Sequence, residues 1–195
     1  MKLNATDIPG VVIVEPSVFG DERGWFMETY QEPRFHRELA ALGLPAPRPF
    51  VQDNHSCSAA GVLRGLHYQV APHPQGKLVR VVRGAAWDVA VDIRPGSPTF
   101  GRWVGTELSA DNHRQMWIPE GLAHGFLALQ DDTHFLYKTT DVYARDCERA
   151  ISWNDPRLDI AWPLDRIGGA PRLAEKDARA PTLEDAARQD GQYRA

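Results

Sequence analysis

The sequence is poor in cysteine and in long hydrophobic runs. Its two cysteines, Cys57 and Cys147, lie far apart and form no CxxC pair, so a disulfide framework or a cysteine-based zinc site has little support. No apolar run approaches the ~20 residues that are needed to cross a bilayer. The N-terminal stretch MKLNATDIPG contains no apolar signal core. We therefore expect no membrane association and a cytoplasmic location.

Basic tracts, internal repeats and low-complexity segments are also missing. The formal net charge is −4, so a nucleic-acid partner is not expected, although single arginines can still hold a phosphate. A length of 195 residues with 43% hydrophobic and 25% charged residues is typical of a globular protein with a sizeable core. We expect a single domain over residues 1–195.

The middle of the chain lacks long helical patterns. From residue 50 to residue 153, short β-rich runs such as KLVRVVRG and AAWDVAVDI follow one another, with glycine and proline between them. Many short strands separated by turns predict an antiparallel sandwich or barrel. At the N-terminus, two further strand-like runs, 10–19 and 25–30, flank the turn sequence DERG, which predicts a β-hairpin within residues 1–31.

Two helical patterns flank the β-rich part. In EPRFHRELAALG, which ends at a glycine, Phe35, Leu39 and Leu42 recur at helical spacing. The C-terminal tail, 172–195, also has helical composition, and Thr182 is a candidate N-cap there. The fold class that we expect is mainly β, with short flanking helices near the N- and C-terminal parts.

The stretch GVLRGLHYQ, residues 61–69, places polar side chains in a strand-like segment. Because strand side chains alternate between faces, Arg64 and Tyr68 share one face while His67 lies on the other, and neither face is purely apolar. Polar groups on an interior face cost free energy unless they are paired. The segment is therefore either an ordinary exposed strand or the wall of a polar pocket.

The stretch IPEGLAHGF contains Pro119, Gly121 and His124 in the spacing PxGxxH. This spacing resembles the second motif of cupin jelly rolls, in which the turn delivers a histidine into the barrel. Metal-binding cupins supply a His-x-His pair from their first motif, whereas here His67 is followed two residues later by Gln69. A metal would have too few protein ligands, so we expect no metal. His124 is then a hydrogen-bonding or positioning group, or a core histidine.

Charged residues also occur within two neighbouring strand-like runs. Lys77 begins one run, and Asp88 and Asp92 share one face of the next. Taken singly, such residues are usually solvated charges on edge strands. Together with His67 and His124, they indicate a polar pocket inside a barrel.

Motifs along most of the chain resemble those of the dTDP-4-dehydrorhamnose 3,5-epimerase family. The resemblance runs in register from about residue 8 to residue 185, through FGDERGWF, VQDNHS, GVLRGLHYQ, QGKLVRVV, WDVAVDIRPGSPTFG, WIPEGLAHGF, FLYKTTDVY, ISWNDP and AEKDARAPTL. It implies a cupin-like jelly roll, a homodimer that exchanges its N-terminal strands, and no metal or organic cofactor. The implied substrate is a dTDP-4-keto-6-deoxy sugar.

The resemblance also implies catalytic roles. His67 matches the base that removes the protons at C3 and C5, because imidazole exchanges protons near neutrality. Asp177 matches the carboxylate that orients this histidine, and Tyr137 matches the proton donor. Lys77 matches the residue that holds the developing enolate oxygen. From their shared polar interior, we further expect Asp88 to orient Lys77.

Other matched positions concern substrate binding. Arg23 and Arg64 match pyrophosphate contacts, and Arg23 and Glu28 are expected to come from the partner subunit. Tyr143 matches an aromatic side chain that stacks on thymine. The full implied binding set is Arg23, Glu28, Gln52, Asp53, Asn54, Arg64, His124, Tyr143, Glu148 and Lys176. Structural alternatives remain, namely a hairpin ion pair between Arg23 and Glu28 and a turn capped by Asp53.

Two other functions remain open from the sequence. One is a related epimerase that inverts only one centre on another deoxysugar pathway, since it would keep the same base, lysine and tyrosine. The other is a non-catalytic cupin that binds sugars. The presence of His67, Lys77, Tyr137 and Asp177 favours an enzyme over a pure binding protein.

Overall fold

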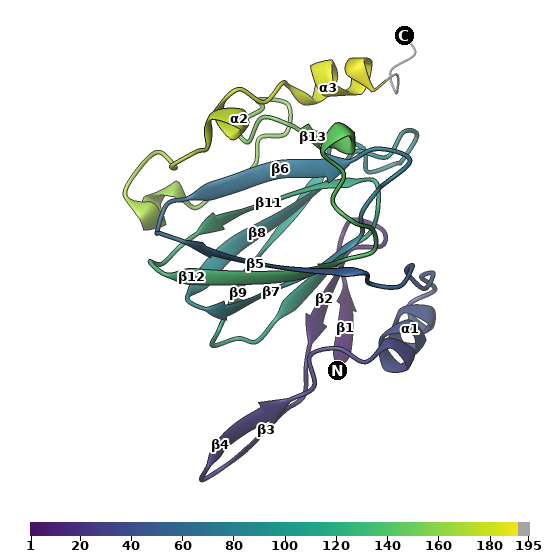
Figure 1. Ribbon diagram of the computed structural model, residues 1–195, viewed down its shortest axis with the longest axis vertical. Coiled ribbons are helices and arrows are strands. Elements are labelled where there is room, and N and C mark those ends of the chain that lie inside the picture. The colour runs from purple at the N-terminus through teal and green to yellow at the C-terminus, as the bar shows by residue number, and fades with distance from the viewer. Residues whose placement is uncertain (191–195) are drawn as a thin grey trace.

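The computed structural model describes residues 1–190, which form two antiparallel sheets packed face to face (Figure 1). One sheet has six strands in the order β1 (Lys2–Ala5), β2 (Val12–Glu15), β10 (Gln115–Ile118), β7 (Lys77–Arg83), β12 (Thr133–Thr139) and β5 (Gln52–Ser58). The other has five strands in the order β13 (Glu148–Ala150), β6 (Leu63–Gln69), β11 (Leu122–Ala128), β8 (Ala85–Asp92) and β9 (Trp103–Ser109). From β5 onward the chain passes repeatedly between the two sheets, as in a jelly roll. The expected mainly β fold is confirmed.

Apolar side chains fill three layers of this sandwich. Between the sheets lies a core that includes Val79, Ala90, Met116 and Phe135. The alternate side chains of the same strands point outward, because successive strand residues face opposite sides. On the six-stranded sheet this outer face is covered by α1, and on the five-stranded sheet it is covered by the C-terminal segment.

The helices follow the expected patterns closely. Helix α1 (Glu32–Ala41) buries Phe35 and Leu39, as predicted, but Leu42 lies at its C-cap and is exposed. In α3 (Leu183–Gln189), the Thr182 hydroxyl accepts a hydrogen bond from the Asp185 amide at 3.2 Å, which confirms the predicted N-cap.

Shorter helical turns lie between these two helices. They are the 3₁₀ turns η1 (Arg145–Cys147) and η2 (Leu164–Ile167) and the single-turn helix α2 (Glu175–Ala178). Of the predicted helical tail, residues 191–195 lie outside the described residues. No helix in residues 1–190 is long and apolar enough to cross a membrane.

The N-terminal hairpin is confirmed, but its first strand is shorter than predicted. The run 10–19 is interrupted at Pro16, where proline supplies no backbone donor for a ladder. The part before Pro16 is β2, in the six-stranded sheet. The part after it is β3 (Val18–Asp21), which pairs with β4 (Gly24–Met27) in a separate two-stranded sheet and projects from the body of the molecule (Figure 1).

Two glycines allow β6 and β11 to approach closely beside His67 and His124. Gly65 has φ +124°, and a Cβ atom added there would lie 2.5 Å from the Cα of Gly125. The pairing of the two strands shifts register between His124 and Phe126. Only glycine fits at position 65, because any side chain would meet both an unfavourable backbone angle and the neighbouring strand.

We predict that Gly65→Ala destabilises the protein far more than a substitution that adds backbone strain alone. Gly168 also has a positive φ, +75°, but nothing lies within 4 Å of an added Cβ, so Gly168→Ala should lower the free energy of unfolding by only about 1–2 kcal/mol. Gly65→Ala should cost at least ~2 kcal/mol more, because the clash adds to the strain. Guanidinium denaturation of both variants tests this difference, and equal losses would contradict it.

Candidate active site

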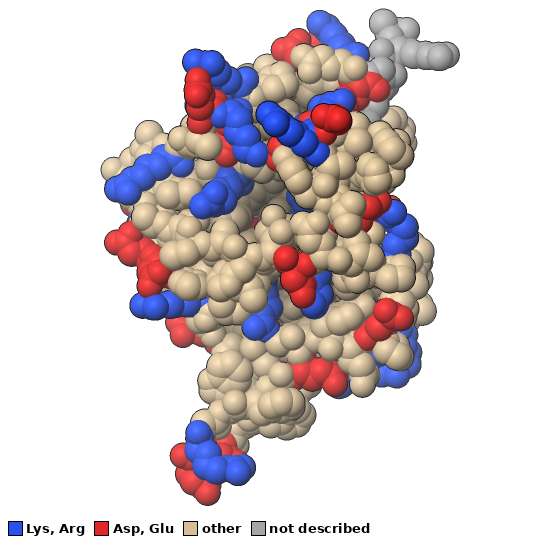
Figure 2. All heavy atoms as spheres, viewed as in Figure 1, with Lys and Arg blue, Asp and Glu red and all other residues tan. Residues whose placement is uncertain are grey.

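A cavity of about 530 Å³ opens between the two sheets beneath the C-terminal segment. Figure 2 shows the surface hollowed there, with basic side chains gathered at the rim. Strands β5, β6, β7, β11 and β12 contribute to its walls, together with residues 172–177. The cavity brings together ten of the fourteen residues predicted for the site: Asn54, Arg64, His67, Lys77, His124, Tyr137, Tyr143, Glu148, Lys176 and Asp177.

His67 and Asp177 form the closest polar pair in this cavity. The Nε2–H of His67 donates to Oδ1 of Asp177 at 2.6 Å, across 110 positions of the sequence. Asp177, in α2, is buried, whereas His67 is partly exposed to the cavity. Because Nε2 is held by the carboxylate, Nδ1 is the nitrogen left for a substrate proton.

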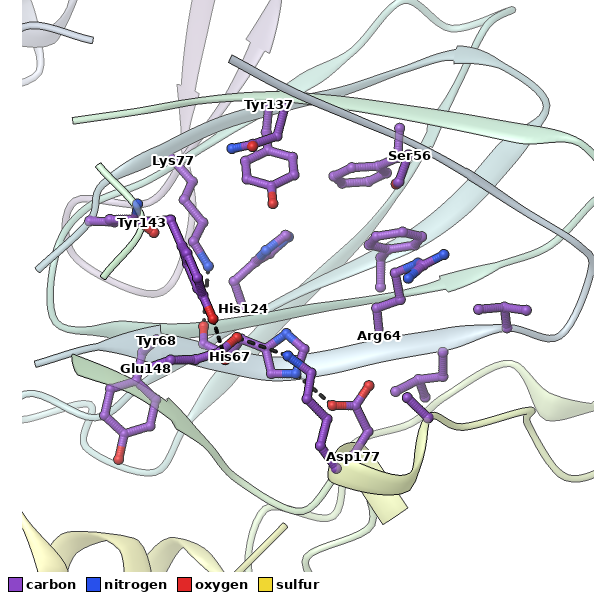
Figure 3. A pocket seen from close by; sticks show the side chains of 18 of the residues that line it. Ser56, Arg64, His67, Tyr68, Lys77, His124, Tyr137, Tyr143, Glu148 and Asp177 are labelled. Atoms are coloured by element: carbon purple, nitrogen blue, oxygen red, sulfur yellow. Dashed lines mark hydrogen bonds and ion pairs between the residues drawn. The ribbon is translucent and has the colours of Figure 1, made fainter. Parts of the chain in front are cut away.

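Lys77 is a buried ammonium group, and no carboxylate in residues 1–190 forms an ion pair with it. Its Nζ donates to the backbone oxygen of His67 at 3.2 Å, which links β7 of one sheet to β6 of the other (Figure 3). Burial lowers the pKa of Lys77 to about 8, while the charges of Asp88 and Glu148 oppose this shift. At neutral pH the group is therefore a cation with unused capacity to bind an oxyanion.

Asp88 and His124 form a second imidazole–carboxylate pair deeper in the sandwich. Nε2 of His124 donates to Oδ1 of Asp88 at 2.7 Å, and both side chains are buried. Burial lowers the pKa of His124, although the charge of Asp88 and its hydrogen bond act in the other direction. The expectation that Asp88 orients Lys77 needs correction, since its hydrogen bond goes to His124 and it acts on Lys77 through charge alone.

Asp92 does not belong to the pocket, although it shares a strand face with Asp88. Its buried carboxylate accepts hydrogen bonds from Arg94, Ser97 and Thr99. It therefore holds the turn after β8 in place.

Tyr137 faces His67 from the opposite wall. It lies on β12 in the six-stranded sheet, and its hydroxyl points into the cavity (Figure 3). Burial raises the pKa of this hydroxyl, an effect that the positive charge of Arg64 partly offsets. The phenol is therefore protonated at neutral pH and available as a donor.

A group of polar side chains lies at the mouth of the cavity. The Tyr143 hydroxyl donates to Oε2 of Glu148 at 3.0 Å, and Nζ of Lys176 donates to Oε1 of the same carboxylate at 2.9 Å. Tyr143 is mostly exposed, which leaves its ring face free for a planar group. Gln52 does not line the cavity but supports this group, because its Oε1 accepts from the Tyr143 amide at 2.9 Å.

Arg64 provides positive charge on the cavity wall. Its Nε donates to the Ser58 hydroxyl at 3.1 Å, and no carboxylate in residues 1–190 forms an ion pair with it. Arg172, which was not among the predicted site residues, lines the same cavity. The two guanidinium groups are suited to an anion with several oxygens, such as a diphosphate.

Arg23, Glu28 and Asp53 lie away from the cavity. Arg23, at the hairpin tip, is 82% exposed and pairs with Asp21 at 2.5 Å. Glu28 lies 3.6 Å from Arg34, so the alternative of an Arg23–Glu28 ion pair is wrong within this chain.

Asp53 is likewise engaged elsewhere. It accepts from Lys138 at 2.9 Å on β12, so it pairs across strands rather than capping a turn.

The cavity also has an apolar wall that was not predicted from the sequence. Phe126 and Phe135 stack with ring centroids 4.0 Å apart, and both line the cavity. Strand alternation could have found them, since Phe126 lies two residues after His124 and Phe135 lies two residues before Tyr137.

Fold and cavity together define a class of protein. A histidine–aspartate pair faces a tyrosine hydroxyl across an open pocket, with a buried lysine beside them. These groups are typical of an enzyme that uses acid–base catalysis, here on a cupin-like jelly roll. The sequence profile of dTDP-4-dehydrorhamnose 3,5-epimerase matches residues 5–185. The chain belongs to this family.

Known relatives cover nearly the whole chain. The dTDP-4-dehydrorhamnose 3,5-epimerase of Pseudomonas aeruginosa is 56% identical over 186 residues, which are 95% of this chain and 98% of the relative. A crystal structure of the Legionella pneumophila 3,5-epimerase in complex with dTDP-4-keto-L-rhamnose is 49% identical, with a TM-score of 0.85 over 94% of this chain and 93% of that one. A 3′-monoepimerase from Streptomyces bikiniensis in complex with dTDP-quinovose is 37% identical, with a TM-score of 0.83. The match covers 96% of this chain and 90% of the monoepimerase chain.

We predict that Lys77 titrates near pH 8, below the ordinary range of lysine, because burial disfavours its charge. Asp88→Asn should lower this midpoint further, since it removes a charge that favours the ammonium. The ¹³Cε and ¹⁵Nζ shifts of labelled protein report the titration, and Lys77→Arg assigns the signal. Lys176 is an internal control, because burial lowers its pKa but the hydrogen bond to Glu148 and the charges of Glu148 and Asp177 together raise it. A Lys77 midpoint at or above that of Lys176 would show that burial does not control its charge.

Proposed function

We propose that this protein converts dTDP-4-dehydro-6-deoxy-D-glucose to dTDP-4-dehydro-L-rhamnose by inverting C3 and C5, a step in dTDP-L-rhamnose biosynthesis. The observation that carries the proposal is the placement of His67 and Tyr137 on opposite walls of one cavity. Inversion needs a base on one face of the sugar and an acid on the other. A sugar ring held between these walls meets both.

The first step is proton removal beside the C4 ketone. The hydrogens at C3 and C5 are acidified by that carbonyl, and Nδ1 of His67 accepts the proton. Asp177 holds the ring in position and stabilises the imidazolium that forms. The electron pair moves to the C4 oxygen, and the Lys77 ammonium stabilises the resulting enolate.

The second step is proton delivery to the opposite face. The Tyr137 hydroxyl donates its proton to the same carbon, which inverts the centre, and the enolate returns to the ketone. Phe126 and Phe135 form an apolar wall beside the reacting groups, which limits water and strengthens the electrostatic interactions there. His124, held by Asp88, positions a sugar hydroxyl.

The nucleotide part of the substrate fits the mouth of the cavity. Arg64 and Arg172 hold the diphosphate, and Tyr143 stacks on the thymine ring. Glu148, which Lys176 holds in place, accepts from the Tyr143 hydroxyl, and Gln52 accepts from the Tyr143 backbone amide. Asn54 adds a polar contact from β5.

We also propose a homodimer that exchanges its N-terminal hairpin within residues 1–31. Val18, Phe19, Trp25 and Phe26 are exposed on β3 and β4, which favours burial against a second copy. In the six-stranded sheet of residues 1–190, β5 has a neighbour on one side only, so its open edge can receive a strand.

In such a dimer, Arg23 and Glu28 would reach the cavity of the partner, and Asp53 would lie on the strand that receives it. A cytoplasmic location suits the two free thiols, because reduced cysteines are usual in that compartment.

A second candidate is an epimerase that inverts only one centre. The 3′-monoepimerase from Streptomyces bikiniensis favours it, because that enzyme shares this fold at 37% identity. Incubation of the wild-type protein with dTDP-4-dehydro-6-deoxy-D-glucose in deuterated water separates the two functions. Deuterium at both C3 and C5 of the product supports the double inversion, deuterium at one carbon supports the second candidate, and no exchange supports a pure sugar-binding protein.

We predict that His67→Asn and Tyr137→Phe fail at different steps. His67→Asn removes the base, so deuterium uptake and product formation should both fall by ~10²–10⁴-fold. Tyr137→Phe removes only the donor, so the enolate still forms and is reprotonated from its original face. Deuterium should then enter the remaining substrate while inversion slows more strongly. NMR of substrate and product in deuterated water measures both quantities.

A matched control is His36→Asn, whose residue lies outside the cavity. It should react at the wild-type rate. Inversion by Tyr137→Phe at the wild-type rate would exclude Tyr137 as the donor.

The shared site makes a separate prediction for mixed dimers. In a dimer of one Arg23→Ala chain and one His67→Ala chain, one cavity combines the intact His67 with the partner's intact Arg23, while the other lacks both. Such dimers, purified through two different affinity tags, should keep about half of the wild-type activity. If Arg23 serves its own chain instead, both cavities are defective and the mixed dimer should be as inactive as the parents.

A further inference from the structure

A cluster of metal-ligating side chains lies at the open edge of the six-stranded sheet, outside the catalytic machinery. Cys57 on β5 and His134 on β12 are directly opposite in the antiparallel register. Asp132, in the turn just before β12, lies beside them. One ligand atom of each residue lies within 4.8 Å of the other two.

The spacing of these atoms is close to that of ligands around one ion, and shifts of a few tenths of an ångström would complete the site. Oδ1 of Asp132 lies 3.1 Å from Sγ of Cys57 and 3.3 Å from Nε2 of His134. A tetrahedral Zn²⁺ with ligands at ~2.0–2.3 Å separates neighbouring ligand atoms by roughly 3.3–3.8 Å. We propose that Cys57, Asp132 and His134 bind one divalent transition-metal ion of the zinc type, with water as the fourth ligand.

Two further side chains hold the ligands in this arrangement. Nδ1 of His134 forms a hydrogen bond of 2.9 Å with Nε2 of His55, so Nε2 of His134 is the nitrogen that faces Asp132. A metal-bound histidine usually engages its second nitrogen in this way. Arg83 forms an ion pair of 2.9 Å with Oδ2 of Asp132, which leaves Oδ1 turned toward the thiol and the imidazole.

The ligand types select the ion. Thiolate and imidazole favour zinc and its neighbours over magnesium or calcium, which prefer oxygen ligands. The Cys57 thiol donates to Asp132 in the absence of metal. Metal binding therefore breaks this hydrogen bond and releases the thiol proton to solvent, while neutral His134 carries its proton on Nδ1 toward His55 and the metal oxidation state is unchanged. Thiolate and carboxylate together supply two negative charges against the one positive charge of Arg83.

Occupancy of this site would stabilise the edge of the catalytic cavity. Ser56, next to Cys57, lines the cavity, and the Cys57 backbone oxygen accepts from Arg64 at 3.4 Å. An ion that joins β5 to the start of β12 binds only the folded chain with this geometry, so it raises the unfolding temperature by mass action.

Titration of the metal-free protein with Zn²⁺ and Co²⁺ tests the proposal without any activity measurement. Calorimetry should give one Zn²⁺ per chain with release of a proton, and Co²⁺ should give a thiolate-to-cobalt charge-transfer band. Cys57→Ala and His134→Ala should weaken Zn²⁺ binding by at least ~100-fold, and His55→Ala by ~10–100-fold. Mg²⁺ should not bind, and His113→Ala, at a histidine outside the cluster, should bind Zn²⁺ like wild type.

Several results would overturn the proposal. They are Zn²⁺ binding that survives Cys57→Ala, a Co²⁺ complex without the charge-transfer band, or no Zn²⁺ binding at millimolar concentration. The variants are exposed or half-buried surface positions, and circular dichroism confirms that they are folded before titration. Because the readouts are independent of epimerisation, failure here leaves the proposed function untouched, and failure of that function leaves this site untouched.

Discussion

The hydrogen bond between His67 and Asp177 is the contact on which the rest of the site depends. It joins a strand of the sandwich to a segment 110 residues later, so the C-terminal segment must lie in one place before the histidine has a defined orientation. That segment is fixed at two points beyond α2. The Leu183 amide donates to buried Asp155 at 2.6 Å, and Asp190 accepts from the hydroxyl of Tyr68, the neighbour of His67. The tail is therefore part of the active-site framework and not an appendage to it.

Burial of charge is the cost of this arrangement. Lys77 has a pKa of about 8 in the folded protein against 10.5 for an ordinary lysine, so the folded state binds its proton less tightly than the unfolded chain does. Between these two values the unfolded state holds more protons, and the contribution of Lys77 to stability rises with pH. Below pH 8 the buried cation destabilises the fold fully. Within the described part of the chain no carboxylate forms an ion pair with Lys77, so in the proposed mechanism the ammonium that destabilises the fold is also the group that stabilises the enolate.

Local patterns in the sequence predicted the helices and most strands. The side-chain partners in the site could not be predicted, because they depend on contacts between residues that are distant in the sequence. Phe35 and Leu39 predicted α1, and Thr182 predicted the start of α3, because helical spacing and capping depend on residues that are close in the sequence. The partner of Asp88 was assigned wrongly, since Lys77 and His124 are both candidates until the order of β7, β8 and β11 is known. Likewise, the pairing of Cys57 with His134 depends on the register of β5 and β12. Arg23 and Glu28 lie away from the cavity of their own chain, because the hairpin β3–β4 and the residues next to it project from the body of the molecule.

The two-sheet architecture explains why this fold suits an inversion reaction. A single sheet face presents its side chains from one side, so a base and an acid on it would approach a sugar from the same direction. Here His67 comes from the five-stranded sheet and Tyr137 from the six-stranded sheet. Nζ of Lys77, on the six-stranded sheet, donates to the backbone oxygen of His67 on the five-stranded sheet. This hydrogen bond joins the two walls of the cavity. The proposed inversion then follows from the packing of the two sheets, because the proposed base and the proposed donor lie on opposite walls of the cavity.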